Sequence, residues 1–139
     1  MRPKPFIIGF FAVVAILGAA SLYLAFTVVP AEKSFTAFPA PDTKYTAVKI
    51  TVTRAGDPPF CVDGIAVVLG VYPDEFAERD KAYLVYGAPC AADHALPKIE
   101  WLSNTDLRIT YAKNPAAKPP ELKGYDVTKT VNVTFVARN

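Results

Sequence analysis

The stretch "IEWLSNTDLRITY", residues 99–111, decides the fold class because it holds two short strands and the turn that joins them. Apolar and polar side chains alternate on both sides of its centre, which is the pattern of strands with one buried face. The centre, residues 103–106, reads Ser-Asn-Thr-Asp, and these side chains bond readily to nearby backbone groups in turns. The stretch therefore predicts a β-hairpin, with Trp101 in the core.

Further strands are predicted on both sides of the hairpin. Alternating side chains, or apolar runs bounded by turn residues, mark residues 45–54, 61–72, 83–87 and 127–138 as strands. Residues 73–82 are charged and lack β-branched side chains, which favours one or two helical turns. The proline-rich residues 112–124 predict a surface loop. This succession of strands without a long helix predicts a mainly β fold, an antiparallel β-sandwich or small barrel-like domain.

An uncharged segment precedes the β region. Residues 6–29 contain no charged side chain over 24 positions. As a helix they would be about 36 Å long, enough to cross a hydrocarbon core of about 30 Å. Arg2 and Lys4 precede the segment, so the positive-inside rule places the N-terminus in the cytoplasm. The alternative is a signal peptide cleaved after Ala31, although such a peptide ordinarily has an apolar region of only about 7–15 residues.

The expected organisation follows from these segments. Residues 1–5 are a cytoplasmic tail, residues 6–29 a transmembrane helix acting as a signal anchor, residues 30–44 an extended stalk, and residues 45–139 an exported β domain. The expected location is the bacterial inner (cytoplasmic) membrane, crossed once, with the C-terminal domain periplasmic or extracellular. Membrane lipid is then a partner of residues 6–29.

Charge narrows the choice of partners. All 13 acidic residues and 13 of the 15 basic ones follow residue 31, so the exported part has a formal net charge of zero. A nucleic-acid binder would show a basic stripe, and a binder of anionic lipid a basic cluster along the chain. The sequence shows neither, which argues against nucleic acid as a partner.

The two cysteines are the sharpest chemical signal. Cys61 and Cys90 both follow the anchor, on the side of the membrane where disulfides form and persist. One intramolecular disulfide between them would stabilise the domain by about 3–4 kcal/mol on the chain-entropy model. The competing interpretation is a metal site made by Cys90 and His94, or a redox dithiol. The cysteines are too far apart for a C-x-x-C motif, and a metal site normally needs three or four ligands.

No enzymatic motif is present in the sequence. It contains no Gly-x-Ser-x-Gly elbow, no phosphate-binding loop and no His-Glu-x-x-His. The chain is therefore expected not to be an enzyme and to need no cofactor. Tyrosines and a tryptophan on the predicted strands are expected to pack in the core, although such residues are also enriched in interface hot spots. The sequence does not show which of these aromatic residues face solvent.

Two segments carry a resemblance to known proteins. "APDTKYTAV" at 40–48 and "IEWLSNTDLRITY" at 99–111 resemble the PDGKY…W-x-x-x-x-L-x-I-x-Y pattern of a group of small, uncharacterised bacterial exported domains. Thr43 stands where the pattern has glycine. The same segments are similar to TolB-type propeller blades, but about four blades of 40–45 residues do not fit in this domain. The resemblance implies an extracytoplasmic, membrane-anchored β domain and no catalytic residue.

The sequence supports two functional hypotheses from different classes. The first is a single-pass, non-enzymatic accessory or scaffold subunit of an envelope membrane complex, which contacts a membrane-protein partner. The second is an immunity-type periplasmic inhibitor of a toxic enzyme. A metal- or redox-handling domain at Cys61, Cys90 and His94 is a third. The residues that contact a partner cannot be named from the sequence.

Overall fold

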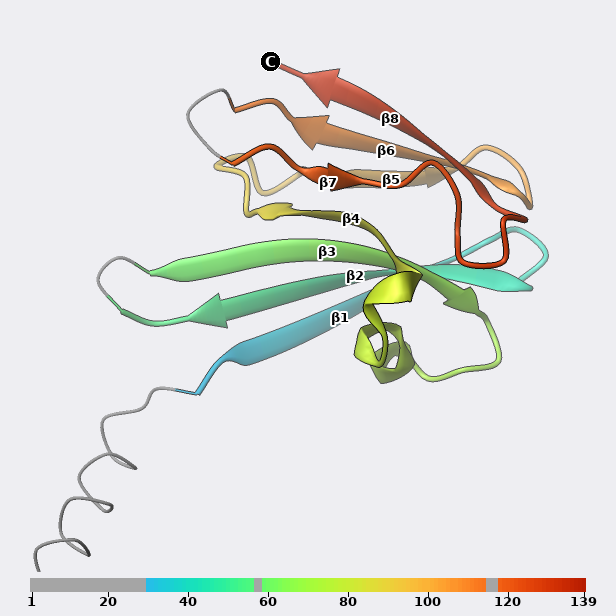
Figure 1. Cartoon of the computed structure of the whole chain (residues 1–139), viewed down its shortest axis with the longest axis horizontal. Coiled ribbons are helices and arrows are strands. Elements are labelled where there is room, and N and C mark those ends of the chain that lie inside the picture. The colour runs from blue at the N-terminus through green and yellow to red at the C-terminus, as the bar shows by residue number, and fades with distance from the viewer. Residues whose placement is uncertain (1–29, 57–58, 115–117) are drawn as a thin grey trace, which may run out of the picture. The chain divides into compact units, whose positions relative to one another are not determined.

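Residues Ala31–Asn139 form one compact unit in the computed structural model. The structure describes residues 30–56, 59–114 and 118–139, so the expected tail at 1–5 and anchor at 6–29 lie outside the described residues. Within the described ranges, no helix is both long enough and apolar enough to span a bilayer. The unit consists of two β-sheets and a pair of short 3-10 helices (Figure 1). A mainly β fold is therefore confirmed.

The larger sheet has five strands in the order β1-β2-β3-β4-β7, and all of its pairings are antiparallel. Its strands are β1 (Glu32–Pro39), β2 (Tyr45–Arg54), β3 (Phe60–Leu69), β4 (Leu84–Pro89) and β7 (Glu121–Leu122). The strands expected at 45–54, 61–72 and 83–87 are confirmed, although β3 ends at Leu69. The two-residue strand β7 lies inside the stretch that was expected to be only a surface loop.

The smaller sheet has the order β5-β6-β8 and contains the hairpin at 99–111. Its strands are β5 (Lys98–Trp101), β6 (Asp106–Ala112) and β8 (Asn132–Arg138). The hairpin is confirmed, with Ile99 opposite Ile109 and Trp101 opposite Leu107. Five residues separate Trp101 from Leu107, one more than in the pattern of the bacterial exported domains.

The expectation of purely antiparallel pairing is wrong for one pair of strands, because β6 and β8 are parallel. The chain leaves β6, crosses to the larger sheet where β7 pairs with β4, and then returns to the smaller sheet. This detour brings β8 back beside β6 in the same direction. Parallel pairs need such a crossover, whereas a tight turn would have produced an antiparallel pair.

The prediction of an extended stalk at 30–44 is also wrong, because residues 32–39 form strand β1. This edge strand pairs with β2 along its whole length, from Glu32 opposite Thr53 to Pro39 opposite Thr46. Phe35 packs on one face of the sheet and Phe38 on the other. The two aromatic side chains therefore break the simple alternation of a half-buried strand. Pro39 is tolerated because it lies at the end of an edge strand.

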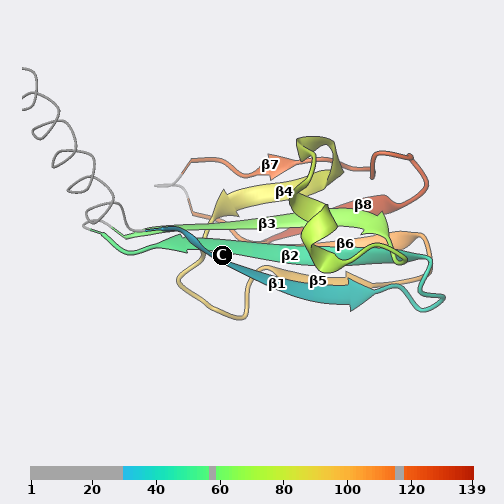
Figure 2. The same ribbon diagram turned by 90° about the horizontal axis from the view of Figure 1, so that it is seen from below.

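The main core lies between the two sheets. Its buried side chains come from β2, β3 and β4 on one side and from β5, β6 and the chain before and within β8 on the other: Tyr45, Ala47, Ile65, Val67, Val85, Tyr86, Ile99, Leu107, Ile109, Val131 and Val133. Figure 2 shows the opposite face of the larger sheet, which is covered by the 3-10 helices η1 (Asp74–Glu78) and η2 (Lys81–Tyr83). These confirm the helical turns expected at 73–82.

The two ends of the domain differ in what they present. At the "entry end" the chain enters β1, and Arg54, Phe60 and Pro89 lie at the neighbouring strand ends. The opposite, "distal end" carries the β1–β2 turn, the loop after β3, the β5–β6 turn and the loop before β8 (Figure 1). At the distal end the Asn104 side chain accepts a hydrogen bond from the backbone N–H of Asp42 at 3.0 Å, which joins the turns of the two sheets.

Candidate functional site

The two cysteines form the expected disulfide at the entry end. Cys61 is the second residue of β3, Cys90 follows β4, and their Cα atoms are 5.4 Å apart. The backbone N–H of Cys90 also donates a hydrogen bond to the carbonyl of Cys61 at 3.1 Å. The bond therefore locks the start of β3 to the end of β4.

The alternative metal site at Cys90 and His94 is contradicted by this disulfide. A metal needs the cysteine as a thiolate, whereas the Cys90 sulfur is bonded to Cys61. His94 is exposed in the loop after β4. No cluster of three or more histidine, cysteine or carboxylate side chains suited to a metal occurs among residues 30–56, 59–114 and 118–139.

The aromatic residues whose exposure could not be read from the sequence fall into two groups, covered and exposed. Tyr86 is buried, and Tyr83, Trp101 and Tyr111 are half-buried. Tyr72 differs, because it lies in the turn after β3 and 43% of its surface is exposed. Its ring stacks on Phe76 with a centroid distance of 4.1 Å and an interplanar angle of 14°. Tyr72 is thus a solvent-facing ring held in one orientation.

Tyr72 belongs to an apolar surface at the distal end. We use "distal apolar surface" for five exposed side chains at the end of β3, in the loop after β3 and in the loop before β8: Leu69, Val71, Tyr72, Tyr125 and Val127. Leu69, Tyr72 and Val127 line one hollow of about 170 Å³, whose floor includes Tyr45 and Val67. Val71 is 87% exposed and Val127 50% exposed. Exposed apolar groups gathered in this way mark interaction sites more often than scattered single ones do.

The loop that carries Tyr125 and Val127 is organised by the buried carboxylate of Asp126, which is 4% exposed. Its Oδ1 accepts hydrogen bonds from the backbone N–H groups of Thr130 at 2.8 Å and Val131 at 2.9 Å. Its Oδ2 accepts from the backbone N–H and the hydroxyl of Thr128. Four bonds to one side chain fix the loop, so its apolar residues stay in place without being buried.

The other loop is fixed by a close approach of backbones. A Cβ at Gly70 would lie 2.1 Å from the carbonyl oxygen of Thr43, so only glycine fits there. The N–H of Gly70 donates to the carbonyl of Lys44 at 2.9 Å. Thr43 has φ 62°, the left-handed conformation for which glycine is favoured. Both loops are therefore preorganised, which lowers the entropic cost of binding a partner.

Polar contacts continue beneath the hollow. The hydroxyl of Tyr45 lies 3.5 Å from that of Thr128. Hydrogen bonds with the Thr128 and Thr130 side chains lower the pKa of Tyr45 from its ordinary value, and they outweigh the opposite effect of burial. This phenol ties β2 to the loop of Asp126 and gives the hollow a polar floor beside apolar walls.

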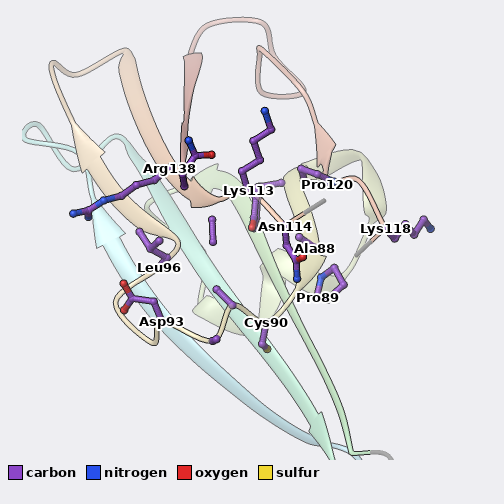
Figure 3. A pocket seen from close by; sticks show the side chains of 15 residues that line it. Ala88, Pro89, Cys90, Asp93, Leu96, Lys113, Asn114, Lys118, Pro120 and Arg138 are labelled. Carbon is purple, nitrogen blue, oxygen red and sulfur yellow. The ribbon is translucent and has the colours of Figure 1, made fainter. Parts of the chain in front are cut away.

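A second hollow, of about 470 Å³, lies at the entry end beside the disulfide (Figure 3). Lys113, Lys118 and Arg138 stand on its rim, and Asp93 is the single acidic side chain that lines it. In Figure 3 the charged ends of the three basic side chains point away from one another. The fold thus gathers bases that are scattered in the sequence, where no basic cluster is visible.

The second hollow is also lined by a phenol with a raised pKa. Tyr86 lines it, and burial, with smaller contributions from Asp63 and Tyr111, raises the pKa of Tyr86 to about 12. The phenol therefore stays protonated at neutral pH. Asp63 is 4% exposed, and its carboxylate accepts a hydrogen bond from the Thr51 hydroxyl at 2.7 Å.

Comparison with known proteins identified no homologue of the chain. No protein-family model, no curated protein and no solved structure matches the chain. The candidate sites therefore rest on the geometry of this domain: a rigid apolar surface at the distal end and a basic rim at the entry end. Sequence patterns had placed Val71 and Val127 in the strands expected at 61–72 and 127–138. In the structure β3 ends at Leu69 and β8 begins only at Asn132, so both valines lie in exposed loops.

Proposed function

We propose that the chain is a single-pass, non-enzymatic accessory or scaffold subunit of an envelope membrane complex. Residues 6–29 anchor it in the bacterial inner membrane with the N-terminus in the cytoplasm, and the β domain is periplasmic or extracellular. The disulfide supports an oxidising compartment for the domain. Two separate sheets packed on one core support a β-sandwich rather than a closed barrel.

The observation that carries this proposal is the distal apolar surface. A soluble domain gains nothing for its own stability by holding Val71 and Val127 in water on two rigid loops. A partner that covered them would gain apolar burial at a low entropic cost. Tyr72, stacked and half-exposed, has the amphipathic character of an interface anchor. We place the partner contact there.

The test is mild crosslinking in native membranes, followed by purification and mass spectrometry. The wild-type chain is compared with a double variant, Val71→Asp with Val127→Asp, and with the control Val136→Asp. Val136 is 42% exposed but lies on β8, away from the two loops. We expect stoichiometric membrane-protein partners with the wild type and the control, and their loss with the double variant. Recovery of the wild type as an anchored monomer would contradict the proposal.

The immunity-type inhibitor remains the second candidate, because the same surface lies at the end opposite the chain entry and could meet a soluble enzyme. The two candidates differ in how they use the anchor. An inhibitor should bind one soluble enzyme tightly in detergent, with residues 6–29 making no contribution. A complex subunit should lose its partners when residues 6–29 are exchanged for an unrelated transmembrane helix.

A further inference from the structure

The basic rim lies at the end of the domain where the chain would leave a membrane. Strand β1 begins there at Glu32, and Arg54 lies opposite Phe60 in the neighbouring pair. Pro89 and Cys90 of the same end line the hollow with Lys113 and Arg138. The disulfide therefore lies directly beneath a surface that faces the chain entry, and it keeps that surface rigid.

The entry end is basic where it is exposed. Arg54, Lys113, Lys118 and Arg138 are exposed, and none of them makes an ion pair with another residue that the structure describes. The exposed acidic side chains in the described part of this end are Glu32, Asp93 and Glu121, which follows Pro120 of the hollow. The Asp93 carboxylate accepts a hydrogen bond from the N–H of Ala95 at 2.9 Å. Four bases outnumber these three acids, although the exported part as a whole is neutral.

The arrangement of the bases suits an extended anionic surface. A single small anion is held by side chains that converge on it, whereas Lys113, Lys118 and Arg138 diverge from the rim of the hollow (Figure 3). At the same end of the domain Phe60, which lies opposite Arg54 and precedes the half-buried Cys61, is 52% exposed. Aromatic and apolar side chains mixed with Lys and Arg are typical of surfaces that rest in the headgroup region of a bilayer.

The tether brings this surface to a membrane. Pro30 and Ala31 alone separate Val29, the last residue of the expected anchor, from Glu32 of β1. Three residue steps span at most about 10 Å. The headgroup layer on one side of a bilayer is about 5–8 Å thick. With the anchor of the proposed function in the bilayer, a tether of this length would hold the entry end near the headgroups at a high local concentration.

We propose that the entry end of the domain docks on anionic phospholipid headgroups of the bilayer that holds its own anchor. Arg54, Lys113, Lys118 and Arg138 contact the phosphates, and Phe60 enters the interface between them. This inference rests on the anchor of the proposed function. Docking on this end leaves the distal apolar surface directed away from the membrane, free to meet a partner.

The experiment uses the full chain in lipid nanodiscs, either of phosphatidylcholine alone or of phosphatidylcholine and phosphatidylglycerol in equal parts. Amide hydrogen exchange is followed at the non-proline residues of this end: Phe60, Cys61, Ala112, Lys113, Asn114 and Lys118. We expect slower exchange there in the anionic nanodiscs only, with no change at the distal loops. High salt should remove the effect, because the Debye length falls to about 3 Å at 1 M.

Two variants separate charge recognition from general effects of charge. The test variant carries Lys113→Gln, Lys118→Gln and Arg138→Gln. The control carries Lys81→Gln, Lys123→Gln and Lys129→Gln, which are exposed lysines away from the basic rim. Each base near an anionic surface contributes about fivefold to the docked fraction, so the test variant should lower the docked-to-undocked ratio roughly 100-fold. The control should behave as the wild type.

The possible failures are distinguishable. If carbonate washing releases the wild type from membranes, the anchor is wrong, and both the proposed function and this inference fall. If the protein is inserted but exchange is the same in both lipids, the inference alone is overturned. Loss of lipid-dependent protection in the control variant as well as in the test variant would overturn it too, because a general charge effect would then explain the result.

Discussion

The indole Nε1 of Trp101 in β5 donates a hydrogen bond to the backbone carbonyl of Phe38 in β1, at 2.7 Å. This bond joins the hairpin of the smaller sheet to the edge strand of the larger one. Trp101→Phe keeps an apolar ring but loses the bond, so we expect a loss of about 1–2 kcal/mol in the free energy of unfolding. Urea denaturation followed by circular dichroism measures it. Tyr125→Phe, at a 57% exposed position, serves as the control and should stay within about 0.5 kcal/mol.

Reduction of the disulfide should weaken the entry end. The Cys61–Cys90 bond closes a loop with a sequence separation of 29. The double variant Cys61→Ala with Cys90→Ala should lose about 2–4 kcal/mol of unfolding free energy. Wild-type protein unfolded with and without dithiothreitol provides the matched comparison, and its reduced form should agree with the variant. Equal midpoints for the oxidised and reduced wild type would refute a stabilising role.

Asp126 should matter both for stability and for the distal apolar surface. Asp126→Ala leaves four donors of residues 128–131 without their acceptor, which should cost roughly 2–4 kcal/mol. Asp126→Asn keeps one acceptor oxygen and should lie between the alanine variant and the wild type. Hydrogen exchange at Thr128, Thr130 and Val131 measures the loosening of the loop. Unchanged exchange in the alanine variant would show that other contacts hold this loop.

Tyr86 should make the domain sensitive to alkali. Its folded pKa of about 12 exceeds the ordinary value of 10 for tyrosine, so the unfolded chain loses this proton first. The stability that Tyr86 contributes is therefore complete below pH 10 and is lost as the pH rises towards 12. Tyr86→Phe should remove this part of the decline, at most roughly 3 kcal/mol. The measurement is the urea midpoint of the wild type and of Tyr86→Phe at a series of alkaline pH values. The difference between the two midpoints should change as the pH rises from 10 towards 12, and a constant difference would contradict the prediction.

Local signals were sufficient for the hairpin, for β2 and β3, and for the helical turns. Each of these has a period or a composition that a few neighbouring residues reveal. Strand β1 was not predicted because Phe35 and Phe38 pack on opposite faces of the sheet and two prolines follow Phe38. The parallel pairing of β8 with β6 was not predicted because the direction in which β8 runs depends on the path of the chain through the other sheet. Both are properties of the whole fold.

The candidate surfaces were harder to predict than the fold. Only the disulfide could be read from the sequence, because two cysteines permit a single pairing. Lys113 and Lys118 belong to one loop, and Arg138 comes to the rim of the same hollow only through the pairing of β6 with β8. Tyr72 and Val127 line one hollow only because two rigid loops bring them together. The residues that fix those loops, Gly70 and Asp126, carry no functional signature of their own.

The crossover between β6 and β8 also governs when the domain can become native. Strands β1 to β4 follow one another along the chain and pair as neighbours, so these four strands can pair before the later segments are synthesised. Leu107 and Ile109, by contrast, pack with Val131 and Val133, which follow only after the crossover. Until those valines are in place, the inner face of the hairpin lacks its packing partners from the segment of β8. A chain arrested near residue 125 during synthesis should therefore expose apolar core side chains and be degraded by proteases.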